Sequence, residues 1–137
     1  MNKHLKVVIA MAVVSVFAMS FTQIQAQDFV KKDVPSEFKS KENPHKGDES
    51  LKMIGLRNFN RHCVACHGKK GEGDGVMAKN LKTSPGDLTL AEMDQYNDGE
   101  IYYLSFIGIA DRPDFMKLIP SEEDKWAVVN YVRSLKK

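Results

Sequence analysis

The chain has 137 residues, of which 42% are hydrophobic and 28% are charged, with 20 lysines and arginines against 18 aspartates and glutamates. This length leaves room for one small domain. The formal net charge of +2 comes without a basic patch and without basic residues interleaved with aromatic ones. The composition therefore argues against a nucleic-acid-binding protein.

Residues 1–26 have the pattern of a secretory signal peptide. Lys3 and Lys6 make the start positive, an apolar run of about 15 residues follows, and small Ala26 is the expected last residue before cleavage. The run is shorter than the roughly 20 residues that span a bilayer. We expect export to the periplasm and no stable membrane insertion after cleavage, with an uncleaved N-terminal membrane anchor as the alternative.

Residues 27–47 are predicted to be a polar lead-in or linker. They mix charges of both signs with Pro35 and Pro44 and show no sustained period. The folded domain is expected over residues 48–137. Once the signal peptide is removed, 18 basic and 18 acidic side chains remain. The near-zero net charge argues against strong long-range steering, although a local patch of charge can still steer a partner.

A first helix is predicted from about Asp48 to Cys63. Leu51, Gly55, Phe59 and Cys63 follow one another at four-residue steps, which places them on one helical face. This face holds a small residue, an aromatic ring and Cys63, and Cys63 is also the first residue of the motif that follows.

The sequence Cys63-Val64-Ala65-Cys66-His67 is the attachment pattern of a c-type haem. Each thiol can add across one haem vinyl group, and the imidazole of His67 can bind the iron as the proximal ligand. A redox dithiol, half of a zinc site and a disulfide are the alternatives. The first usually lies in a βαβ unit, the second needs four protein ligands, and the third would close too small a loop to stabilise much. We therefore predict one covalent haem c per chain.

Two loops follow the haem motif. Residues 68–75 hold four glycines, which let the backbone turn sharply beside the haem, and residues 83–88 form the second loop. A phosphate-binding loop is the weak alternative for the glycines, because no strand precedes them and no Gly-Lys-Ser/Thr follows. A short helical turn is expected at 76–81.

A helix is predicted over residues 98–109. Asn97 can cap its start, and Glu100 is placed to complete a capping box. Residues 110–120 hold two prolines and are predicted to be a loop.

The last helix is predicted to start after Ser121, which caps it and is followed by three acidic residues that suit the helix dipole. Its apolar stripe comprises Trp126, Val128, Val129, Tyr131, Val132 and Leu135. We expect this stripe to pack on the first helix near Gly55, where a missing side chain allows close approach.

The chain resembles a bacterial class I monohaem cytochrome c over about residues 48–137. The resemblance rests on the first helix with its haem motif, on the glycine loop at 70–75, and on the segments 98–103 and 120–135. It implies an all-α cytochrome c fold, in which the N- and C-terminal helices pack around one covalently attached haem. It also implies that the carbonyl of Pro85 accepts a hydrogen bond from Nδ1–H of His67, which would orient the imidazole.

The sequence departs from this family at the sixth iron ligand. The family usually has methionine immediately before proline, in a Met-Pro-x-Phe stretch, but here Arg112 precedes Pro113. A guanidinium is a very poor iron ligand, although Arg112 could pair with a haem propionate. Met116 is the nearest replacement. The alternatives are Met93, Met77, a lysine or His45 as the ligand, and a site that is open or holds water.

The predicted function is that of an exported electron carrier. It would pass single electrons to a redox partner protein by transient docking, and would transform no small-molecule substrate. No nucleophile–base arrangement suggests an enzyme. The alternative is a haem protein whose open or weak sixth site binds a small gas ligand.

Overall fold

The computed structural model describes residues 32–108 and 113–137. Within these ranges every regular element is helical and none is a strand, so the predicted all-α class is confirmed. The elements are α2 (Ser36–Lys39), η1 (Glu49–Leu51), α3 (Lys52–His62), α4 (Val64–His67), η2 (Ala78–Asn80), η3 (Ala91–Gln95), α5 (Asp98–Phe106), α6 (Phe115–Leu118) and α7 (Glu122–Ser134). The predicted signal peptide lies outside the described residues. None of the described helices is long and apolar enough to span a membrane.

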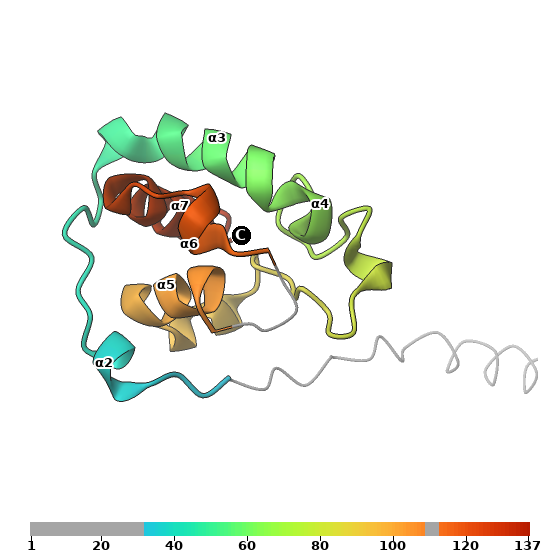
Figure 1. Ribbon diagram of the computed structural model, residues 1–137, viewed down its shortest axis with the longest axis horizontal. Coiled ribbons are helices and arrows are strands. Elements are labelled where there is room, and N and C mark those ends of the chain that lie inside the picture. The colour runs from blue at the N-terminus through green and yellow to red at the C-terminus, as the bar shows by residue number, and fades with distance from the viewer. Residues whose placement is uncertain (1–31, 109–112) are drawn as a thin grey trace, which may run out of the picture. The chain divides into compact units, whose positions relative to one another are not determined.

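The two longest of the described helices, α3 and α7, pack along each other and form the core (Figure 1). The α7 residues from Lys125 to Val129 are all buried, and Phe59 on α3 is 1% exposed. Gly55 lies at the closest approach, because a Cβ atom there would stand 2.8 Å from the carbonyl carbon of Ala127 and 2.9 Å from Cβ of Tyr131. The predicted packing of the last helix at Gly55 is confirmed.

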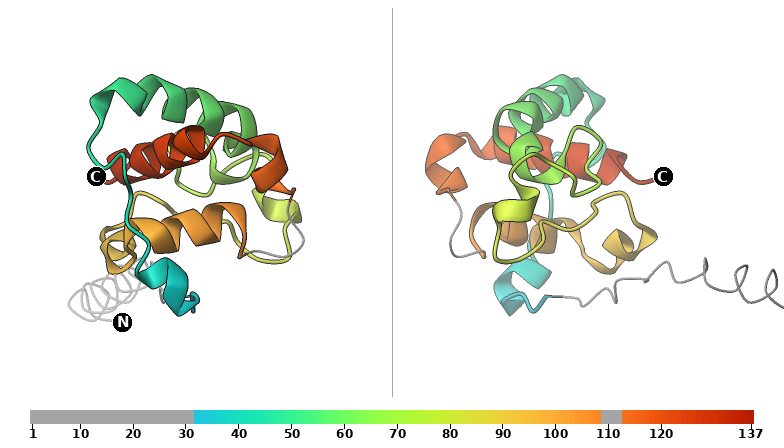
Figure 2. Two further views of the ribbon diagram at one scale, coloured as in Figure 1. Left: turned by 60° about the vertical axis from the view of Figure 1, so that its left-hand side comes forward. Right: turned by 90° about the vertical axis from the view of Figure 1, so that its right-hand side faces the viewer.

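Helix α5 starts with the predicted capping box. Asn97 Oδ1 accepts from the backbone N–H of Glu100 at 2.9 Å, and the backbone N–H of Asn97 donates to the Glu100 carboxylate at 2.8 Å. The helix ends at Phe106, whereas the prediction extended to 109, which lies outside the described residues. Helix α5 contacts both α7 and α2, as Figure 2 shows in two further orientations.

The short helices α6 and η3 were not predicted from the sequence. Helix α6 interrupts the predicted loop at 110–120, because the Asp114 carboxylate accepts from the backbone N–H of Lys117 at 3.3 Å and caps a helical turn. The 3-10 helix η3 follows the loop at 83–88. The predicted turn at 76–81 is present as η2, and the predicted Ser121 cap accepts from the N–H of Asp124 at 3.2 Å.

Residues 32–47, which we call the strap, are the described part of the predicted lead-in. They belong to the same compact unit as the helices, which spans Lys31–Lys137. Val34 is 1% exposed, and the short helix α2 contacts α5. The N-terminal approach to the domain is therefore held against it over the described residues.

Candidate functional site

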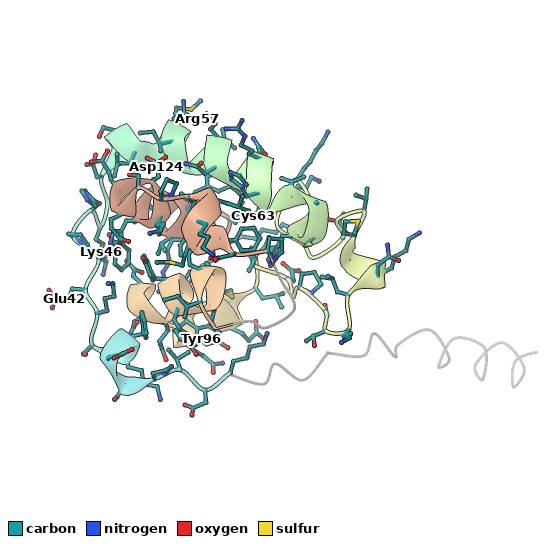
Figure 3. All side chains as sticks on the ribbon, in the orientation of Figure 1. Glu42, Lys46, Arg57, Cys63, Tyr96 and Asp124 are labelled. Atoms are coloured by element: carbon teal, nitrogen blue, oxygen red, sulfur yellow. The ribbon has the colours of Figure 1, made fainter. Side chains whose placement is uncertain are left out.

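The side chains of the two cysteines and the histidine of the motif project from a single helical turn. The backbone N–H of Cys63 donates to the carbonyl of Phe59 at 2.8 Å, and the N–H of His67 donates to the carbonyl of Cys63 at 2.9 Å. Cys63 therefore ends α3 and starts α4 (Figure 3). Because helical positions i, i+3 and i+4 share a face, both thiols and the imidazole project to the same side. All three residues are half-buried.

The imidazole of His67 rests against the core. Its Nδ1 atom is buried, and its ring centroid lies 6.4 Å from that of Phe59. The Phe59 ring in turn packs on Tyr131 of α7, with the centroids 5.1 Å apart. With Nδ1 on the protein side, Nε2 is the nitrogen that can face a metal. The α3–α7 core therefore sets the orientation of this imidazole.

The glycine loop closes onto the free carbonyl groups of α4. The backbone N–H of Gly73 donates to the carbonyl of His67 at 2.8 Å, that of Gly75 to Cys66 at 3.1 Å, and that of Met77 to Ala65 at 2.8 Å. These carbonyls end a helix and would otherwise need water or a cap. The loop thus holds the CxxCH turn from its C-terminal side.

Glycine is required at several of these loop positions. Gly68 and Gly73 have φ angles of +77° and +79°, a region that side chains with a Cβ atom rarely adopt. A Cβ atom at Gly75 would stand 2.6 Å from the carbonyl carbon of Ala65, so close approach of the two backbones requires the third glycine. The sequence predicted the loop correctly but not these bonds.

The residues present fit a covalently held haem. Two thiols and one imidazole on one face supply the atoms that thioether bonds and an axial bond need. Beside α4, Val76 is 79% exposed and Met77 is 46% exposed, although both are apolar. Apolar side chains at this place suit a large flat ring, because covering them removes apolar surface from water.

The structure places the remaining predicted residues as follows. Pro85 is half-buried between η2 and η3, and Arg112 lies outside the described residues. Met116 lies on α6, and its sulfur is 3.9 Å from the hydroxyl oxygen of Tyr102 on α5. Met93 is half-buried in η3, and Met77 precedes η2.

A polar cluster near Met116, in which buried Tyr102 and Lys125 meet the exposed Glu122, was missed by the sequence analysis. The Tyr102 hydroxyl donates to the Glu122 carboxylate at 2.9 Å, and Lys125 Nζ donates to the same carboxylate at 2.6 Å. The Lys125 side chain is only 3% exposed. Burial, and next the hydrogen bond to Glu122, raise the pKa of Tyr102, while the bond from Lys125 lowers the pKa of Glu122. The sequence signal for this ion pair was Lys125, three residues after Glu122 at the predicted start of the last helix.

A protein-family model matches more than half of the chain. The family model described as Cytochrome c matches residues 53–136, from the first turn of α3 to the end of the C-terminal helix and beyond. No curated protein matches the chain. The matched range includes the CxxCH turn, the glycine loop and the α3–α7 core.

Proposed function

Because the chain belongs to the cytochrome c family, we propose that it is an exported one-electron carrier. Domains of this family hold a covalently attached haem c. In this proposal Cys63 and Cys66 form its two thioether bonds, and His67 Nε2 is the proximal iron ligand. The observation that carries the proposal is the CxxCH turn, which directs both thiols and the imidazole to one side.

The bound haem c supplies an iron that changes between the ferrous and ferric states. The chain's part is to keep the ligand geometry the same in both states, so that little has to rearrange when an electron moves. The Phe59 ring and the glycine loop restrain His67 from two sides. In the proposal the Pro85 carbonyl also accepts from Nδ1–H of His67, which orients the ring and raises its basicity.

The direct test of the attachment is a haem stain after denaturation, with the protein made in a host that attaches c-type haem. Wild type should keep the stain. The double variant Cys63→Ala/Cys66→Ala should lose it, and Met53→Ala, an exposed position on α3, should keep it. A stain that survives in the double variant would contradict the assignment.

We propose Met116 as the sixth ligand of the closed carrier. A His/Met pair raises the reduction potential and closes the iron to small molecules. Met116 lies three residues after Pro113, on the short helix that the Pro-x-Phe stretch leads into. The far-red band of a methionine sulfur on ferric iron should be present in wild type and absent in Met116→Leu.

A second function is favoured by one observation. Arg112 stands where the family has its methionine. This favours a haem protein with an open or weakly held sixth site that binds a small gas ligand. Rapid binding of CO to the ferrous wild-type protein, at the rate shown by Met116→Leu, would support this function over the carrier. In either case Arg112 is proposed to pair with a haem propionate, and an unchanged potential and stability in Arg112→Ala would exclude that pairing.

The proposed redox partner presents an acidic surface. Residues 57–82 hold six basic and two acidic side chains, whereas residues 83–137 hold six basic and ten acidic ones. The neutral mature chain thus contains a stretch of net +4, which includes the haem motif, and one of net −4, while residues 27–56 are neutral. The basic side chains of the first stretch, all exposed, are Arg57, Arg61, Lys69, Lys70, Lys79 and Lys82.

Three of these cations lie on elements that contact α4. Arg57 and Arg61 are one turn apart on the outer side of α3, where Figure 3 shows Arg57 directed away from α7. Lys79 lies on η2, which contacts α4. One of the two acids, Glu72, is paired with Lys137. The site of electron exchange would therefore lie in a positive local field.

Ferricyanide, an anionic oxidant, tests this field. Lys79→Glu should slow oxidation at low ionic strength, since reversing a charge within about a Debye length opposes the approach of the anion. The control Lys46→Glu reverses an exposed lysine far from α4 in the sequence and should leave the rate unchanged. Added salt should remove the difference. Equal rates for the two variants would contradict a positive field centred on α4.

Export is proposed from residues 1–26, with cleavage after Ala26 and the domain in the periplasm. The mass of the protein isolated from a periplasmic fraction tests it, since cleavage predicts a chain that starts at Gln27. A chain that keeps residues 1–26 and is recovered with membranes would instead support an N-terminal anchor. The proposed boundaries are 27–47 for the lead-in and 48–137 for the cytochrome c domain.

A further inference from the structure

The strap, residues 32–47, lies outside the range matched by the family, 53–136, and yet makes specific contacts with it. At its start, the backbone N–H of Lys32 donates to the Tyr96 hydroxyl at 2.8 Å. Near its end, Asn43 Nδ2 donates to Asp98 at 3.0 Å and to Asn130 Oδ1 at 2.8 Å. The start of the strap is therefore tied to Tyr96, between η3 and α5, and its end to α5 and α7.

The middle of the strap lies on an aromatic ring of α5. The Phe38 ring stacks on Tyr102 with centroids 6.4 Å apart and a 15° angle between planes. Lys41 Nζ lies 4.9 Å from the centroid of Tyr102 and 5.7 Å from that of Trp126 on α7. Such ring and cation–π contacts favour one ring position over others.

The backbone of α5 is shaped for this approach. A Cβ atom at Gly99 would stand 2.5 Å from the carbonyl oxygen of Lys41 and 2.9 Å from its Cβ atom. The side chain of Asn97 also donates to the carbonyl of Lys39 at 2.6 Å. The backbone of the strap thus packs directly against the backbone of the first turn of α5.

Tyr102 connects the strap to the segment between α5 and α7. Its ring contacts Phe38 and Lys41 of the strap and also packs on Trp126, with centroids 4.7 Å apart. Its hydroxyl donates to Glu122 at the start of α7 and lies 3.9 Å from the sulfur of Met116 on α6. Because the proton goes to the carboxylate, the hydroxyl restrains Met116 by contact rather than by donating to it.

We propose that the strap is a positioning element for the sixth side of the haem. Through Phe38 and Lys41 it fixes Tyr102, and through Tyr102 it fixes the place of α6 and Met116. This inference rests on the proposed role of Met116 as the sixth ligand. Loss of the strap contacts increases the fraction of molecules in which that ligand has left the iron.

The test compares two double variants of the full mature holo-protein. Phe38→Leu/Lys41→Met removes the two contacts with Tyr102. The matched control, Glu42→Gln/Lys46→Met, changes two exposed strap residues, labelled in Figure 3, and keeps those contacts. The readouts are the far-red methionine–iron band of the ferric protein and the rate of CO binding to the ferrous protein.

We expect the Phe38/Lys41 variant to bind CO about tenfold faster, because ring and cation–π contacts of this kind together change an equilibrium by about that factor. Its far-red band should be weaker, while the control matches wild type. Tyr102→Phe keeps the ring but releases Glu122, and it should shift CO binding in the same direction. A Phe38/Lys41 variant that melts earlier but keeps the wild-type band and CO rate would overturn the proposal.

The Met116→Leu variant distinguishes failure of the strap proposal from failure of the assignment of Met116 as the sixth ligand. If Met116→Leu leaves the band and the CO rate unchanged, Met116 is not the ligand and the strap proposal falls with it. If Met116→Leu abolishes the band while the Phe38/Lys41 variant matches wild type, the ligand assignment stands and only the strap proposal is overturned.

Discussion

Replacing Gly55 by alanine tests the contact that places the haem motif on the core. A Cβ atom at Gly55 would lie 2.8 Å from the carbonyl carbon of Ala127, a residue with no exposed surface, and 2.9 Å from Cβ of Tyr131. Both distances are shorter than carbon atoms tolerate, and the Ala127 carbonyl is backbone, which cannot turn aside. The two helices must therefore separate locally.

Two effects of opposite sign decide the magnitude. Alanine is a better helix former than glycine by about 1 kcal/mol. Overpacking a tight core costs about 1–3 kcal/mol. A clash with helix backbone should cost as much as the upper end of this range or more, because backbone cannot turn aside. We expect a net destabilisation of about 2 kcal/mol, which lowers the melting temperature of a domain this size by roughly 10 °C.

Thermal unfolding of the ferric holo-protein, followed by circular dichroism, measures this. The control is Met53→Ala on the same helix, where the side chain is 69% exposed and the change should stay within about 0.5 kcal/mol. A Gly55→Ala protein that melts at or above the wild-type temperature would refute the close contact of α3 with α7, since helix propensity alone would then govern the result.

Three further predictions concern the rest of the domain. The bond from Lys125 lowers the pKa of Glu122 below its ordinary value of 4.5, so its contribution to stability is complete above that value and is lost as the pH falls from there through the lowered pKa. Because the Glu122 side chain is 60% exposed and screened by solvent, Glu122→Gln should destabilise the protein by no more than roughly 1 kcal/mol at pH 7. It should also flatten the acid side of the stability profile, whereas Glu123→Gln at the neighbouring position should do neither; equal acid profiles for wild type and Glu122→Gln would count against the pair. Asn97→Ala removes the capping box of α5 and should cost about 1 kcal/mol in urea unfolding, and no change in the midpoint would mean that the cap is not formed. Cys66→Ser should leave a single thioether bond, which mass spectrometry of the denatured chain reads as haem held through one cysteine.

The haem motif and the two long helices could be predicted from local signals. The CxxCH pattern acts within five residues, and the Asn97 and Ser121 caps depend only on residues three positions away. The packing at Gly55 was also predictable, because a glycine within a four-residue apolar repeat marks where another helix can approach. Each of these signals depends on residues that are close together in the sequence.

The strap and the polar cluster could not be predicted in the same way. Phe38 and Lys41 lie in a segment of mixed charge without a period, and their partner Tyr102 is more than sixty residues away. The acids at the start of α7 fit the helix dipole equally well whether or not a tyrosine reaches them. Only the fold shows that Glu122 joins Tyr102 to Lys125.

The optical spectrum of the ferric, mature holo-protein tests the central claim most directly. The account predicts a low-spin spectrum with the weak far-red band of methionine sulfur on iron, in a protein whose haem stays with the chain after denaturation. A high-spin spectrum without that band, together with rapid CO binding after reduction, would contradict the closed electron carrier and leave the gas-binding haem protein in its place.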